Sequence, residues 1–184
     1  MMMLAGIATA SADEAKEYFS VGNPIKYCDT AYYLQWSTDI NNYYFIQEYL
    51  PQGQTFDDYT KMFTVSVMFT DNTAKDILES KLAWVAERRK TDMVCNSRMF
   101  KQDDEYMLDF ITSEGNDEGL TQVERNIVRY YPMKINGQSA VIQCYYTSRA
   151  YGDDILPFIK AISDNSTDLC NAMILMKITP RFIR

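Results

Sequence analysis

Four strand-like runs follow one another in the second half of the chain with only short turns between them. They cover residues 97–102, 105–113, 122–131 and 140–148. Asp103-Asp104, an acidic segment at 114–119 and Asn136-Gly137 lie between these runs. Asn-Gly between two β-like runs is the strongest short-range signal of a hairpin. Because strands joined by such short turns must run antiparallel, this region predicts an antiparallel sheet.

Two more strands are expected earlier in the chain. Residues 62–69 alternate, with Phe63, Val65 and Val67 on one side, which is the period of a half-buried strand. Residues 43–50 are rich in aromatic and β-branched side chains, which favours a strand that Pro51-Gln52-Gly53 ends. Residues 13–36 carry weaker signals, and there we expect a short helix over 14–19 and an edge strand over 32–36.

Helical spacing appears in two segments. Residues 73–90 carry an apolar stripe, with Thr73 as the expected N-cap and Asp76 in the capping-box position. A second helix is expected to begin at Asp153 or Asp154 and to end near residue 163, where Asn165-Ser166-Thr167 breaks the pattern. A last strand is expected over 169–178.

This order of elements differs from the strand–helix alternation of parallel sheets. We predict an α+β fold, with a twisted, largely antiparallel sheet of about six to eight strands packed by two main helices. The chain has 184 residues and no visible linker, so residues 13–184 are expected to form a single globular domain.

The N-terminal residues 1–12 are apolar and uncharged, and they end in Ala10-Ser11-Ala12, the small-x-small pattern that signal peptidases accept. We therefore expect a signal-peptide remnant and an exported protein, periplasmic or extracellular. The segment lacks the basic start of a signal peptide, so the alternative is ordinary N-terminal structure in a cytoplasmic protein. A membrane span needs about 20 apolar residues, and we expect none here.

The chain contains no histidine and has a formal charge of −7. Without histidine, Ser-His-Asp and Cys-His nucleophiles and His-containing zinc sites are excluded. An acidic chain lacks the basic field that nucleic-acid binding requires. We expect no nucleic-acid partner and no cofactor, and we interpret the missing histidine as evidence against catalysis.

The four cysteines are Cys28, Cys95, Cys144 and Cys170, with no CxxC pair among them. In an oxidising compartment they could form two disulfides in three connectivities. The alternative is that several are buried free thiols, which suits Cys144 in the middle of an apolar strand.

The segment EYLPQGQT at residues 48–55, followed by Tyr59-Thr60-Lys61-Met62, is similar to a motif of uncharacterised exported bacterial proteins. In those proteins a strand ends in E-Y-[LV]-P-x-G, and an aromatic-Thr-x-Met step begins the next strand; Tyr59 stands where Trp is commoner. Arg149 followed by Tyr151-Gly152-Asp153 resembles them as well. The order of elements also resembles the α/β/α sandwich of the Mog1/PsbP type. The resemblance implies an accessory or binding role and no catalytic residue.

Tyrosine is abundant, with 14 residues, several of them in adjacent pairs such as Tyr32-Tyr33 and Tyr130-Tyr131. Neighbours on a strand face opposite sides, so one ring can pack inward while the other stands outside. Outward tyrosines beside arginines suit a protein or glycan contact, whereas the alternative is sheet packing. The candidate binding residues are Tyr49, Tyr59, Arg129, Arg149, Tyr151 and Asp153.

These features predict a non-enzymatic, exported binding or accessory protein of the bacterial cell envelope. The alternative is a carboxylate-dependent hydrolase acting on glycans, which needs two acids in one cleft. Its candidates are Glu48, Asp57, Asp58 and Asp109. Asp109 lies inside an apolar strand and is expected to point to solvent, because buried acids are rare; if it faces inward it must have a partner.

Two further patterns are interpreted without a ligand. The acidic segment at 114–119 lacks the spacing of an EF-hand calcium loop, so we expect a solvated hairpin turn. Asn165-Ser166-Thr167 matches a glycosylation acceptor, but we interpret it as a turn between a helix and a strand.

Overall fold

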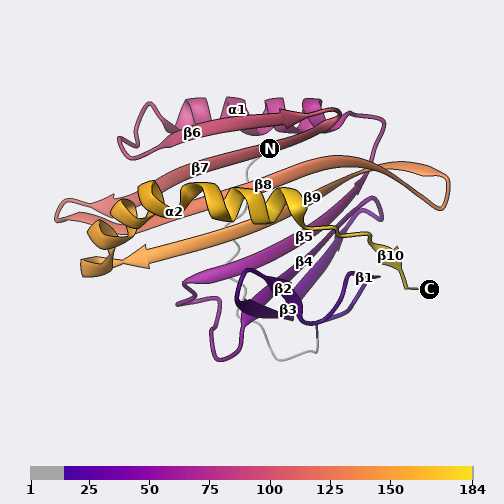
Figure 1. Ribbon diagram of the computed structural model, residues 1–184, viewed down its shortest axis with the longest axis horizontal. Coiled ribbons are helices and arrows are strands. Elements are labelled where there is room, and N and C mark those ends of the chain that lie inside the picture. Colours follow the sequence, from indigo (N-terminus) through magenta and orange to yellow (C-terminus); the bar gives the residue numbers. More distant parts are fainter. Residues whose placement is uncertain (1–14, 184) are drawn as a thin grey trace.

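The computed structural model describes residues 15–183, without the side chains of residues 163–166, and it is dominated by one curled antiparallel sheet (Figure 1). Eight strands form this sheet in the order β2-β3-β4-β5-β9-β8-β7-β6. Their bounds are β2 (Ile25–Tyr27), β3 (Thr30–Ile40), β4 (Tyr44–Pro51), β5 (Lys61–Phe69), β6 (Asn96–Gln102), β7 (Glu105–Asn116), β8 (Gly119–Ile135) and β9 (Gln138–Tyr151). The predicted signal-peptide remnant, residues 1–12, lies outside the described residues.

The sheet consists of two meanders, β2 to β5 and β6 to β9, in which each strand pairs with the next along the chain. They join where β5 pairs with β9, from Lys61 opposite Ser148 to Phe69 opposite Ala140. The hairpin between β8 and β9 turns at Asn136-Gly137, both with positive φ (51° and 84°), the conformation that this dipeptide adopts readily. The antiparallel sheet predicted from the turns is therefore confirmed.

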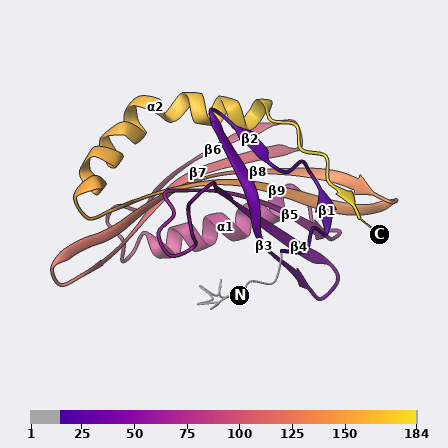
Figure 2. The same ribbon diagram turned by 90° about the horizontal axis from the view of Figure 1, so that it is seen from below.

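Two helices cover opposite faces of the sheet (Figure 2). Helix α1 (Ala74–Arg88) packs on β7 and β8, and helix α2 (Ile155–Leu175), preceded by the short η1 (Gly152–Asp154), packs on β8 and β9. We call the two sides the α1 face and the α2 face. Because strand residues alternate, β8 places Val128 and Tyr130 in the core beneath α1 and Ile127 and Tyr131 in the core beneath α2.

Helix α1 begins as its sequence predicts. The Asp76 backbone N–H donates to the Thr73 hydroxyl at 3.2 Å, and the Thr73 N–H donates to the Asp76 carboxylate at 2.8 Å. These reciprocal bonds satisfy two donors that every helix start leaves open. The hydrogen bonds from Thr73 hold the pKa of Asp76 below its usual value.

Two short strands, β1 (Phe19–Ser20) and β10 (Arg181–Phe182), form a separate antiparallel pair. The buried amide of Gln47 in β4 anchors this pair, since its oxygen accepts from the Tyr18 and Phe19 N–H groups and its nitrogen donates to the Phe19 carbonyl. The ring of Phe182 packs against Phe19 and Phe45. This pair closes one end of the core beneath α2.

The C-terminal part of the fold differs from the prediction. The predicted break at Asn165-Ser166-Thr167 and the predicted strand over 169–178 are wrong, because α2 continues to Leu175. The side chains of Cys170 and Met173, spaced by three, are both buried in the core against the sheet, which is a helical rather than a strand pattern. Residues 15–18 likewise form no helix, and β3 extends well beyond the predicted edge strand at 32–36.

The structure also bears on the predicted fold class and on the state of the cysteines. The protein is mostly β, with an eight-stranded sheet and three short helices, rather than the balanced α+β sandwich expected from the sequence. All four cysteines are free thiols, three of them buried and Cys28 exposed, which is the second of the two alternatives that the sequence left open. Within residues 15–183, no helix combines the length and apolar character needed to cross a membrane.

Candidate binding site

The loop between β4 and β5, residues 52–60, is held by its own polar side chains. The Gln54 amide oxygen accepts from the Thr60 and Lys61 N–H groups at 2.9 and 3.3 Å, and its nitrogen donates to the Thr60 hydroxyl at 3.0 Å. The Asp58 carboxylate accepts from the Thr55 hydroxyl at 2.7 Å, a bond that lowers the pKa of Asp58. Gly53 supplies the positive φ of 85° that the turn after β4 requires. The loop is therefore ordered before any ligand arrives.

A second set of contacts ties this loop to the end of β9. The Arg149 guanidinium lies 4.1 Å from the centre of the Tyr59 ring, and the Arg149 backbone N–H donates to the Thr60 carbonyl at 2.9 Å. The Tyr151 hydroxyl donates to the Tyr59 carbonyl at 3.0 Å. Arg149 also forms an ion pair with Glu124 on β8. Two segments that lie about 90 positions apart in the sequence thus meet in space.

Glu48 lies on the α1 face near this cluster, in the row between Trp36 on β3 and Thr64 on β5. Burial raises the pKa of Glu48 to about 7, and the positive charge of Arg149 opposes this shift. Within residues 15–183 its carboxyl group makes no hydrogen bond. A carboxyl with a pKa near neutrality and spare bonding capacity is the most reactive acid of the cluster.

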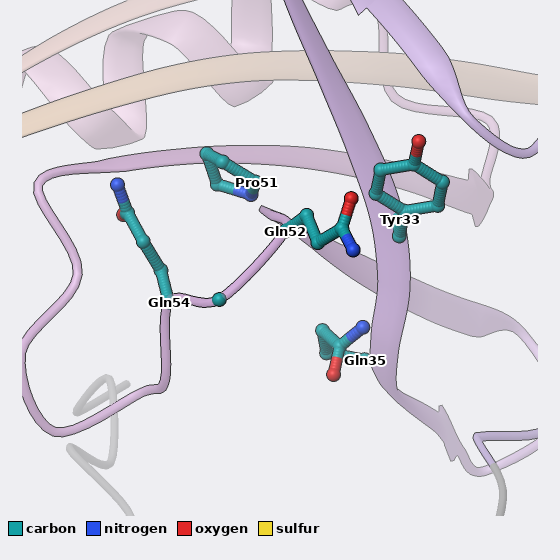
Figure 3. Close-up of a pocket in the computed structure, with 6 residues that line it drawn as sticks. Tyr33, Gln35, Pro51, Gln52 and Gln54 are labelled. Atoms are coloured by element: carbon teal, nitrogen blue, oxygen red, sulfur yellow. The ribbon is translucent and has the colours of Figure 1, made fainter.

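An open cleft of about 500 Å³ lies between the loop and β3 (Figure 3). Its lining is uncharged and consists of Tyr33, Gln35, Pro51, Gln52, Gly53 and Gln54. Figure 3 shows Tyr33, Gln35 and Gln52 around the same opening, with Gln54 on the far side of the turn. Among the described residues, the Tyr33 hydroxyl and the amides of Gln35 and Gln52 have no hydrogen-bond partner, so these three groups are free for a ligand.

The position of Gln35 results from a β-bulge in β3. Leu34 pairs with Tyr49 and Trp36 pairs with Glu48, so Gln35 is an extra residue with no paired residue on β4. Bulges re-aim side chains and are common beside binding sites. No signal in the sequence marks this bulge, which is why Gln35 is absent from the candidate residues.

The candidate binding residues divide into two groups. Tyr59, Arg149 and Tyr151 are in mutual contact, and Asp153 is exposed in η1 just after them. Tyr49 and Arg129 lie elsewhere. Tyr49 has no exposed surface and its hydroxyl accepts from Gln47 at 2.5 Å, whereas Arg129 binds Glu105 and the carbonyls of Met173 and Met176 at the end of α2. In this fold both side chains serve the interior.

The candidate acids do not share a cleft. Asp109 is buried on the α2 face, so the prediction that it points to solvent is wrong. A buried acid is expected to have a partner, and Asp109 has two, Arg98 and Arg125. Both guanidiniums donate to its carboxylate, at 2.7 to 2.9 Å. Glu48 lies on the opposite face, so these two acids cannot act on one bond. Asp57 and Asp58 are exposed on the loop.

In the described part of the chain, no group of three acidic or cysteine side chains lies close enough together to bind a metal ion. The acidic segment at 114–119 is the hairpin turn between β7 and β8, as predicted. Tyr59 is only 4 % exposed, so the aromatic surface available here is the ring of Tyr33 in the cleft, beside the free amides of Gln35 and Gln52.

A family model matches residues 19–178, which is most of the chain. The proteins of that family are uncharacterised, and no function is attached to it. The comparison with curated proteins gave no match, and the comparison with solved structures gave none either.

Proposed function

The chain belongs to this uncharacterised family, and from its own geometry we propose that it is a non-enzymatic binding protein exported to the bacterial cell envelope. The proposed contact surface is the β4–β5 loop and the cleft beside it. The partner is a protein or a glycan.

One observation carries this proposal: some polar side chains of the loop form hydrogen bonds within the loop, whereas others form none. Gln54 makes three hydrogen bonds, while its neighbour Gln52 is exposed and makes none within the described residues. A surface ordered in advance loses less entropy when a partner binds, which raises affinity. An unbonded amide beside an ordered turn is thus better suited to a contact than to fold stability.

Export is supported by the composition of residues 1–12, and a binding role by the resemblance of residues 48–62 to exported proteins. The order of elements in the sequence also resembles the Mog1/PsbP-type sandwich. Such folds host several functions, so the fold alone does not select one.

The proposal can be tested by photo-crosslinking in the native host. A benzophenone amino acid at position 52 should yield an adduct with envelope material, and the same group at Gln138, an exposed glutamine in the β8–β9 hairpin, should yield none. The intact mass of the recovered protein should equal that of a chain that begins at Asp13. Adducts equally frequent from both positions, or a cytoplasmic protein that retains Met1, would overturn the proposal.

The alternative function is a carboxylate-dependent hydrolase acting on glycans. One observation favours it: Glu48, with a pKa of about 7, and Glu124 both lie near Arg149, so two carboxyl groups meet beside one arginine. Glu124, however, already binds Arg149 and the Asn126 amide. Release of reducing sugar that Glu48→Gln abolishes and Asp57→Asn leaves unchanged would favour the hydrolase over the binding protein.

A further inference from the structure

We propose that the cleft beside the β4–β5 loop binds a neutral glycan, with a sugar ring stacked on Tyr33 and its hydroxyl groups bonded to Gln35 and Gln52. This inference rests on the proposed binding function and names the chemical class of the ligand.

Tyr33 supplies the stacking surface. It is 38 % exposed, whereas its neighbour Tyr32 is 1 % exposed and belongs to the core beneath α2. The face of an aromatic ring carries partial negative charge, and one face of a pyranose presents C–H bonds with partial positive charge. An exposed tyrosine at the rim of a shallow polar cleft therefore matches a sugar ring.

The two free amides supply the polar contacts. Each carries a carbonyl acceptor and an NH₂ group with two donors, and neighbouring sugar hydroxyls both donate and accept. Figure 3 shows the Gln35 and Gln52 side chains on the two sides of one opening, on β3 and on the loop respectively. The bulge of β3 places Gln35 there. A ligand with several adjacent hydroxyls can bond to both amides at once.

The absence of charge from the lining narrows the ligand class. None of the six lining residues is acidic or basic, although the whole chain has 25 acidic and 18 basic side chains. Ionic ligands would lose hydration in such a site without gaining an ion pair. A peptide would find no charged group and little apolar surface, since only Tyr33 and Pro51 provide any. A neutral, hydroxyl-rich ligand fits best.

The size and order of the cleft agree with this class. Its volume of about 500 Å³ is within the usual range of small-ligand sites. One wall is the turn that Gln54 holds by hydrogen bonds to Thr60 and Lys61. The ligand does not have to order that wall on binding.

Titration calorimetry with the trisaccharides chitotriose and maltotriose tests the proposal. We expect the described cleft to bind at least one of them weakly, because the contact is small and open. Tyr33→Ala should weaken binding roughly tenfold or more, and Gln52→Ala severalfold. The matched control is Tyr43→Ala, which removes a similarly exposed ring (44 %) at the opposite end of the β3–β4 hairpin and should leave the affinity unchanged.

The two proposals fail in different ways. If neither sugar binds while position 52 still crosslinks to a polypeptide, the glycan assignment is wrong and the binding function stands. If neither sugar binds and position 52 crosslinks to nothing, both fail. Binding that Tyr33→Ala and Tyr43→Ala weaken equally would also overturn the glycan assignment, because the cleft would then not be the site. Unfolding midpoints of all variants should equal that of the wild type, which separates these results from misfolding.

Discussion

Two buried glutamines on opposite faces of the sheet differ in how their amides are used. Gln47, on the α2 face, is fully buried and makes four hydrogen bonds, to the Tyr18 and Phe19 backbone and to the Tyr49 hydroxyl. Gln143, on the α1 face, is 3 % exposed; its oxygen accepts from the Tyr145 hydroxyl at 3.2 Å, but its nitrogen has no partner.

The same difference extends over both faces. On the α2 face the charges of Asp109 and Arg125 are buried together with matched bonds. On the α1 face the hydroxyls of Ser66 and Tyr130 are buried without a well-formed hydrogen bond within the described residues, although the Tyr44 and Tyr145 hydroxyls lie near them. Buried polar groups in folded proteins normally have hydrogen-bond partners, so the α2 face has the hydrogen bonding expected of a purely structural core. The α1 face retains bonding capacity that stability does not use.

The largest effect is expected where a buried charge loses its partner. Asp109→Ala leaves Arg125, which is 2 % exposed, without its carboxylate, so we expect a loss of about 3–5 kcal/mol in the free energy of unfolding. Urea denaturation measures this. Asp104→Ala, in the exposed turn between β6 and β7, is the control and should cost less than about 0.5 kcal/mol. Equal losses would mean that the buried ion pair of Asp109 and Arg125 adds no stability beyond that of an exposed acid.

The two glutamines provide the direct comparison. Gln47→Leu breaks four hydrogen bonds and leaves buried backbone groups unpaired, so it should cost about 2–3 kcal/mol. Gln143→Leu removes an amide whose nitrogen is already unpaired, so its cost should stay below about 1 kcal/mol. If Gln143→Leu destabilises as much as Gln47→Leu, the α1 face is as structural as the other.

Glu48 adds a pH dependence to the α1 face. Its pKa rises from the usual 4.5 to about 7 in the folded protein, so the folded state binds the proton more tightly than the unfolded chain. Stability from this group is therefore full below the unfolded pKa, falls as the pH rises through the folded value, and is lost above it. Glu48→Gln removes the penalty and should raise the free energy of unfolding by about 2 kcal/mol near pH 8.

The comparison of urea midpoints near pH 8 and near pH 5 isolates this effect. The gain of Glu48→Gln should shrink to less than half near pH 5, because the folded state is protonated there while the unfolded chain, with a pKa of 4.5, is only partly ionised. Asp57→Asn, an exposed acid on the neighbouring loop, should show no such trend. A gain independent of pH would mean that the carboxyl group is not the cause.

The smallest effect is expected at Ser66. Its hydroxyl is buried and unpaired, so Ser66→Ala removes an unmet polar group and no bond. The free energy of unfolding should change by less than about 0.5 kcal/mol or increase slightly. Thr147→Val is the matched change, because the Thr147 hydroxyl donates to Asn126 at 2.8 Å on the same face. Its loss should lower the free energy of unfolding more than the loss of the Ser66 hydroxyl. Equal losses would indicate that Ser66 has a partner in solution.

Sequence patterns predicted the elements whose signals are local. The alternation at Phe63, Val65 and Val67, the capping box of Thr73 and Asp76, and the Asn136-Gly137 turn each depend on a few neighbouring residues, and each is confirmed. The end of α2 failed because Asn165-Ser166-Thr167 favours a turn only in isolation. Burial of Cys170 and Met173 against the sheet overrides that local preference.

The site was less predictable, because it depends on contacts between distant strands. Asp109 meets Arg98 and Arg125 only through the register of β6, β7 and β8, which no local pattern reveals. Gln35 enters the cleft through a bulge. Tyr59 and Arg149 were identified separately, by resemblance and by residue type, and only the pairing of β5 with β9 brings them together.

The pairing of β5 with β9 also has a consequence for synthesis of the chain. β5 ends at Phe69, but its partner begins only at Gln138, so during translation the nascent N-terminal meander exposes β5 as an open edge for seconds. Its sequence, KMFTVSVMF, combines high strand preference with a single charge and no proline or glycine, which is the signature of an aggregation-prone segment. The ribosome therefore delivers an aggregation-prone strand of this protein long before the strand that covers it.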